Sequence, residues 1–86
     1  MYIPQLEPDS KRILQLIKQH GVCTGRQLSF EAKIAPTRLV EVVNSLVKYD
    51  LISASGGIYD PKEIGQAYFN IRPSNSSLAE LVIRGA

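Results

Sequence analysis

Apolar residues recur at helical spacing through the first half of the chain, with polar residues between them. Gly21 can close the first helical segment in the left-handed conformation. Pro36 can open the third, because a residue in the first helical turn needs no partner for its N–H. Thr24 and Gln27 have the spacing of a capping box at the start of the second. The pattern predicts an extended arm over residues 1–8 and helices over 10–20, 25–33 and 36–49. Asp9 or Ser10 is expected to cap the first helix.

The second half of the chain predicts a small hairpin followed by helical segments. Strands are expected over residues 51–54 and 58–60, because both are short and apolar and Ser55–Gly57 between them is a turn signal. Asp60–Glu63 combines an acidic cap, a proline and a glutamate, so a fourth helix is expected to begin there. The apolar stretch Leu78–Ile83 fits either a short last helix or a strand.

Length and composition limit the possible architectures. At 86 residues and 44% hydrophobic content, the chain fits one globular domain over 1–86, with its core in 10–70 and an extension over 74–86. No apolar run approaches the roughly 20 residues that span a bilayer, and no secretory signal pattern is present, so we expect a cytoplasmic protein without a membrane partner. The net charge of +2 permits a nucleic-acid partner without requiring one.

Residues that could carry out catalysis or hold a metal are sparse. Cys23 is the single cysteine and can form neither an internal disulfide nor a zinc cluster, so a buried, inert thiol is favoured. His20 stands near the end of the first predicted helix, where a cation suits the helix dipole. The sequence contains no glycine-rich phosphate loop, metal-ligand pair or nucleophile–base set. We therefore expect no enzymatic activity, no cofactor and no metal.

The order of three helices and a hairpin, together with several residues, resembles the winged helix-turn-helix superfamily. The segment Arg12–Gly21 is similar to the family's first helix, and Thr24 with Leu28 to its second. The proline-started helix and the residues Asp50–Ile52 after it are similar to the family's third helix and its end, and Gly56–Tyr59 resembles the hairpin of the short-wing variant. The resemblance implies a mostly α fold with a small β-hairpin: a three-helix core, a wing and an additional C-terminal helical segment.

The resemblance also implies a function, because the third helix of this family reads bases in the major groove. We therefore expect a small transcriptional regulator that binds double-stranded DNA sequence-specifically through its recognition helix, residues 36–49. Arg38 and Lys48 are expected to make the strongest contacts. The candidate DNA-binding residues are Arg26, Thr37, Arg38, Glu41, Asn44, Ser45, Lys48, Ser55, Gly56 and Gly57.

Two departures from the family pattern keep a second function open. Ala35 replaces the usual serine, and Glu41 stands where a basic residue is common; its carboxylate repels phosphate but can accept from a cytosine amino group. The alternative is therefore a winged-helix module that binds a protein partner through Val40, Val42 or Leu78–Ile83. Because the charge is weak, DNA binding would favour a homodimer, with Leu78–Ile83 packing across a two-fold axis.

Overall fold

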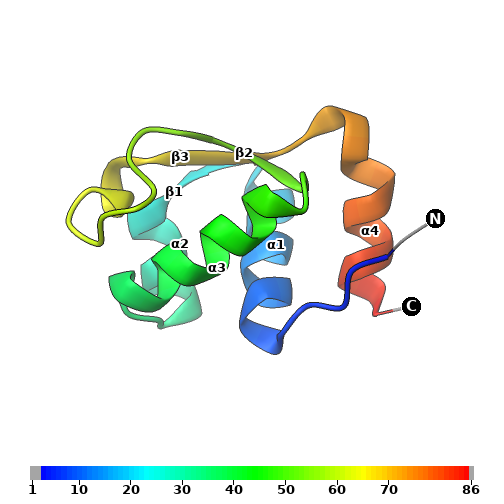
Figure 1. Cartoon of the computed structure of the whole chain (residues 1–86), viewed down its shortest axis with the longest axis horizontal. Helices are drawn as coiled ribbons and strands as arrows, with labels where there is room; N and C mark the ends of the chain where they lie inside the picture. The colour runs from blue at the N-terminus through cyan, green and yellow to red at the C-terminus, as the bar shows by residue number, and fades with distance from the viewer. Residues whose placement is uncertain (1–2, 86) are drawn as a thin grey trace.

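The computed structural model describes residues 3–85, which form four α-helices and a three-stranded antiparallel sheet (Figure 1). The elements are α1 (Pro8–His20), β1 (Val22–Thr24), α2 (Gly25–Ala32), α3 (Pro36–Lys48), β2 (Ile52–Ser55), the 3-10 turn η1 (Ile64–Gln66), β3 (Tyr68–Ile71), the 3-10 turn η2 (Pro73–Asn75) and α4 (Ser76–Arg84). Helix α1 lies at the centre, with α2, α3 and the loop between β2 and β3 on one side and α4 on the other. This is the arrangement of a winged helix-turn-helix domain with an added C-terminal helix.

The three predicted helices of the first half are present, with shifted ends. Helix α1 begins earlier than expected because Pro8 occupies its first turn; the cap is Glu7, without a side-chain hydrogen bond, so the predicted caps Asp9 and Ser10 are wrong. The arm is correspondingly shorter, and its first two residues lie outside the described part of the chain. Helices α2 and α3 each end one residue before the predicted boundary. In α2, Thr24 Oγ1 accepts from Gln27 N at 3.1 Å, which confirms half of the capping box.

The predicted hairpin is correct in its first strand and wrong in its second. Strand β2 pairs with β3, in the register Ile52↔Ile71 and Ser55↔Tyr68, and residues 56–67 form the loop between them. Residues 58–60 are not a strand, and the fourth helix expected after Asp60–Glu63 shortens to the turn η1. Strand β2 pairs with residues 68–71 because their alternation, with Tyr68 exposed and Phe69 fully buried, places one face of the strand on the core.

Strand β1 has no counterpart in the predictions. It is only three residues long and follows Gly21 directly, so no period of alternating residues announces it. Its pairing with β3, in which Cys23 lies opposite Phe69, gives the sheet the order β1-β3-β2. The central strand β3 therefore joins the start of the helix-turn-helix to the end of the wing.

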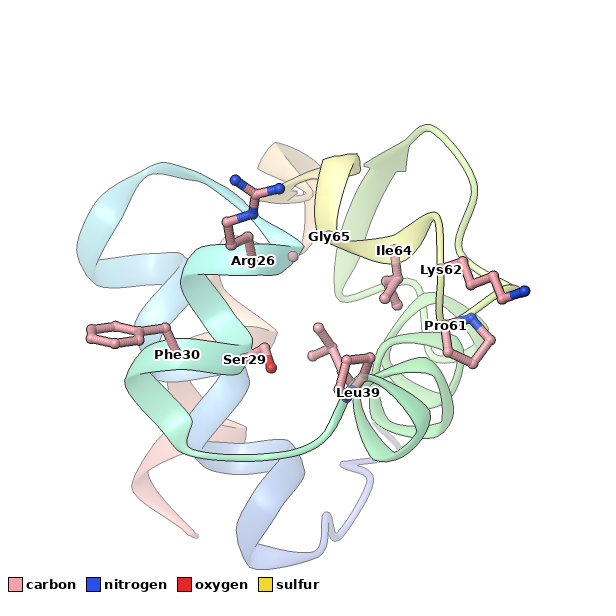
Figure 2. Close-up of a pocket in the computed structure, with 10 residues that line it drawn as sticks. Arg26, Ser29, Phe30, Leu39, Pro61, Lys62, Ile64 and Gly65 are labelled. Atoms are coloured by element: carbon pink, nitrogen blue, oxygen red, sulfur yellow. The ribbon is translucent and has the colours of Figure 1, made fainter.

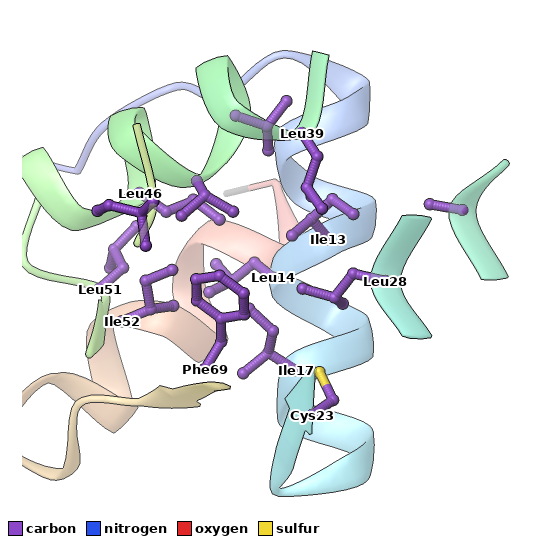
Figure 3. Close-up of a cluster of buried hydrophobic side chains, with 14 of the residues drawn as sticks. Ile13, Leu14, Ile17, Cys23, Leu28, Leu39, Leu46, Leu51, Ile52 and Phe69 are labelled. Carbon is purple, nitrogen blue, oxygen red and sulfur yellow. The ribbon is translucent and has the colours of Figure 1, made fainter. Parts of the chain in front are cut away.

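The core lies between α1 and the sheet and is completed by α3 and α4 (Figure 3). Phe69 of β3 packs beside Leu14 and Ile17 of α1 in its middle. The last segment is a helix, the first of the two predicted alternatives, and its Ala79 and Val82 are part of the same core. Among residues 3–85 no helix has both the length and the apolar character needed to span a bilayer.

Candidate nucleic-acid interface

Helix α3 buries one side and exposes the other. Leu39, Val42, Val43 and Leu46 point into the core; because Val42 is only 1% exposed, the expectation that it docks a partner is wrong. The opposite side carries predicted DNA-binding residues at helical spacing, so they form one stripe. In this stripe Thr37, Glu41 and Lys48 are exposed and Asn44 is half-buried.

Arg38 lies beside that stripe, on the side of α3 that faces the start of α1. Its Nε donates to Asp9 Oδ2 at 3.3 Å, its Nη2 donates to the Glu7 carboxylate, and its Nη1 lies 3.7 Å from Glu41 Oε1. The hydrogen bonds to Glu7 and Asp9 raise the pKa of Arg38 above its ordinary value. Three carboxylates of the chain therefore compensate the charge that was expected to make the strongest DNA contact.

Asn44 contacts the wing as well as its own helix. Its Nδ2 donates to Val40 O at 2.7 Å and to Ile58 O at 2.8 Å. Ser45, the next candidate residue, is half-buried and lines a hollow together with Arg38 and Tyr49. Asn44 therefore lies in the stripe with its amide bonded inside the chain, whereas Ser45 lies beside the stripe, next to Arg38.

The start of α2 and the wing come together at Gly25. Gly25 N donates to Ala67 O at 3.0 Å, and a Cβ at Gly25 would lie 1.9 Å from Ile64 O. The turn before η1 is held by Asp60, whose main-chain O accepts from the amides of Glu63 and Ile64. Glycine is therefore required at position 25, since a side chain there would separate the wing from α2.

A groove of about 340 Å³ opens between α2, the start of α3 and the wing (Figure 2). Arg26 and Lys62 lie on opposite sides of it, with the apolar side chains of Leu39 and Ile64 between them. The first turn of α2 thus presents Arg26 to the exterior, as the sequence predicted for a phosphate contact. The groove is lined by Gly25, Arg26, Ser29, Phe30, Pro36, Leu39, Pro61, Lys62, Ile64 and Gly65.

The predicted wing tip, Ser55–Gly57, is exposed but lies where β2 ends. Ser55 pairs with Tyr68 as the last rung of the sheet, and Gly56 has a φ of +111° that favours glycine. The wing loop continues beyond these residues to Tyr59, whose side chain is 81% exposed, and Lys62. Ser55–Gly57 therefore begin the wing loop.

The charges that remain available on this face are few. Within residues 3–85, Arg26, Lys48 and Lys62 have no ion-pair partner, in contrast to Arg38. Asp60 and Glu63 flank Lys62, so the wing itself is not basic. The described part of the chain also holds no group of three or more His, Cys, Asp or Glu residues that could bind a metal.

Sequence reasoning missed two residues of this face. Lys62 was assigned to a helix start, because the long wing loop has no local sequence signal. Phe30 was not among the candidate site residues, yet it is 82% exposed, and Figure 2 shows it on the outer side of α2. No local signal marked it, since its spacing from Arg26 and Lys33 resembles that of Leu14 from Lys11 and Lys18, and Leu14 is fully buried.

No protein-family model matches this sequence, and no curated protein is similar to it. Two solved structures are similar in fold. One is the adhesin competence repressor AdcR of Streptococcus pyogenes, with a TM-score of 0.68 and 20% identity, over 93% of this chain and 57% of that one. The other is ZitR of Lactococcus lactis, a zinc-responsive MarR family member, with a TM-score of 0.68 and 18% identity, over 92% of this chain and 52% of that one. The likeness confirms the winged helix-turn-helix fold, and this chain spans just over half the length of either neighbour.

Proposed function

We propose that this chain binds double-stranded DNA sequence-specifically and regulates transcription, with α3 in the major groove. The observation that carries the proposal is the exposed stripe of α3, a helix whose start borders the groove between α2 and the wing. A helix that exposes a polar side next to another helix and a wing has the shape that fits a major groove. The fold likeness to a repressor and to a MarR family member supports the same function, which is binding and not catalysis.

The contacts divide between base edges and backbone. Thr37, Glu41 and Lys48 are exposed on the stripe and are the candidates for base edges. Arg26 and Lys62, on the two sides of the groove, are the candidates for phosphate contacts, because they carry unpaired charge within the described chain. Phosphate contacts supply affinity and register, and the stripe supplies selectivity.

We further propose that the chain acts as a homodimer in the cytoplasm. Arg26, Lys48 and Lys62 are few cations for a DNA-binding face, and a two-fold pair doubles the number of phosphate contacts. Leu78, Leu81 and Ile83 of α4 are half-buried and lie on the side of α1 opposite the wing, where a second copy leaves α3 free. A buried single thiol at Cys23 fits a reducing compartment. Light scattering of the wild type and of Leu81→Glu tests the dimer, which the substitution should dissociate.

A fluorescence anisotropy titration tests DNA binding. The probe is a random-sequence duplex pool, from which bound duplexes are selected and then titrated individually between about 50 and 200 mM salt. For the dimer, the slope of log affinity against log salt should fall by about 4 in Arg26→Ala/Lys48→Ala/Lys62→Ala, because the two copies together lose four phosphate contacts and each contributes about 0.9. The control is Arg84→Ala, which removes a cation from the end of α4. Equal slopes for the triple variant and the control would contradict this interface.

A second function is favoured by one observation, the engagement of Arg38 by Glu7, Asp9 and Glu41. A face whose flanking arginine is paired with three carboxylates suits a protein partner better than a phosphate backbone. The exposed Phe30 then provides an apolar contact for that partner. Affinity that changes little with salt, and falls with Phe30→Ala but not with Arg26→Ala, would support this function over DNA binding.

A further inference from the structure

Asn44 stands at the point where the recognition helix meets the wing. Its amide nitrogen carries two hydrogens, and two main-chain carbonyls accept them: Val40 O at 2.7 Å and Ile58 O at 2.8 Å. The opposite orientation of the amide would turn its oxygen toward two carbonyl oxygens, which repel it. The donor capacity of Asn44 is therefore fully used inside the chain.

The bond to Ile58 holds one side of the wing loop. The Ile58 side chain is 8% exposed and packs into the core, so this point of the loop lies directly on α3. The other side is held by the bond from Gly25 N to Ala67 O, at the start of α2. The loop over residues 56–67 is thus attached to both helices of the helix-turn-helix.

This use of Asn44 conflicts with reading a base. An asparagine recognises adenine with one donor and one acceptor, and Asn44 has only its oxygen left. It could offer a donor to DNA only by giving up one of these two bonds, and loss of the bond to Ile58 O would release the wing. We infer that Asn44 is a positioning residue that fixes the wing relative to the recognition helix, and that it does not select a base. The DNA-binding part of this inference rests on the proposed function.

The test replaces Asn44 with leucine, which has a similar size and no hydrogen-bonding group. The control is Asn70→Leu, because the Asn70 amide bonds only to Ile71 O of its own strand. Hydrogen exchange is measured at the main-chain amides of Lys62, Glu63 and Ile64, which donate hydrogen bonds to Asp60 within the wing. In Asn44→Leu these amides should exchange about tenfold faster while the amides of α1 are unchanged, since a net hydrogen bond stabilises by a factor of this order. If the wing amides of Asn44→Leu exchange at the wild-type rate, the inference is overturned.

Binding to duplexes selected by the wild type separates positioning from base reading. A positioning role lowers the affinity of Asn44→Leu about tenfold for every selected duplex, with the same base preference at each position. A base-reading role instead relaxes the preference at one base pair while the wing exchanges as in the wild type, and that result would overturn the inference. If the wild type selects no duplex, the proposed function fails, and the exchange measurement alone decides whether Asn44 holds the wing.

Discussion

Replacing Gly25 with alanine should loosen the wing more than any other single methyl addition to this chain. The added Cβ would lie 1.9 Å from Ile64 O and 2.7 Å from Ile64 C, both main-chain atoms that cannot rotate away. An ordinary contact begins near 3.4 Å, so the turn η1 must retreat by about 1.5 Å. That displacement also stretches the hydrogen bond from Gly25 N to Ala67 O, which is 3.0 Å long.

The change in the free energy of unfolding of Gly25→Ala is the sum of two unfavourable contributions and one favourable contribution. Overpacking a close contact costs about 1–3 kcal/mol, and the weakened hydrogen bond adds about 1 kcal/mol. Alanine returns about 0.4–1 kcal/mol, because it restricts the unfolded chain. The net loss is about 2 kcal/mol, which lowers the melting temperature of a domain of this size by about 10 °C.

Thermal unfolding followed by circular dichroism measures the effect, and Gly65→Ala is the matched control. Gly65 lies in the same turn η1, but a Cβ there would meet only Arg26 Cβ, at 3.9 Å, an ordinary contact. The free energy of unfolding of the control should stay within about 0.5 kcal/mol of the wild type. If Gly25→Ala and Gly65→Ala melt at the same temperature, then the close approach of α2 and the wing does not limit stability, and the reasoning is refuted.

Three further predictions concern the cap, the thiol and the arginine. Thr24→Ala should lower the free energy of unfolding by about 1 kcal/mol in a urea titration, because it removes the acceptor of the Gln27 amide, and Thr24→Ser should keep it. Burial raises the pKa of the Cys23 thiol from 9.0 to about 11. Iodoacetamide at pH 8 should therefore label the folded chain at least about a hundredfold more slowly than the urea-unfolded chain. Equal labelling rates would exclude a buried thiol. Glu7→Gln/Asp9→Asn should raise affinity for a selected duplex and steepen the salt slope of the dimer by about two, because Arg38 of each copy loses two of its three carboxylate partners and can contact a phosphate. Addition of Arg38→Ala should cancel both changes in the same anisotropy titration.

The helices of the first half could be predicted from sequence because their signals are local. A capping threonine, a first-turn proline and a terminal glycine each act within a few residues of the helix end they mark. The buried side of α3 was likewise readable, since Leu39, Val43 and Leu46 repeat at helical spacing. The errors at these helices are limited to their ends, where propensities change gradually from residue to residue.

The wing could not be predicted, because its pairing is not local. Strand β2 was expected to turn back at Ser55–Gly57, and a glycine pair justified that expectation. The partner of Ser55 is instead Tyr68, thirteen positions later, and the choice is made by the burial of Phe69 in a core that only the folded chain contains. Local turn chemistry was outweighed by one large aromatic side chain.

The candidate site follows the same division. The stripe of α3 is a local periodicity and was visible in the sequence, but the state of Arg38 depends on Glu7 and Asp9, which precede it by 31 and 29 positions. The same is true of Asn44, whose second acceptor lies on the wing. A helical periodicity therefore identifies which residues face outward, whereas the contacts that consume their charge or donors come from distant segments. For this chain those contacts remove Arg38 and Asn44 from the expected DNA contacts, while Arg26 and Lys48 stay and Lys62 is added. The salt slope of the triple variant is therefore the decisive measurement.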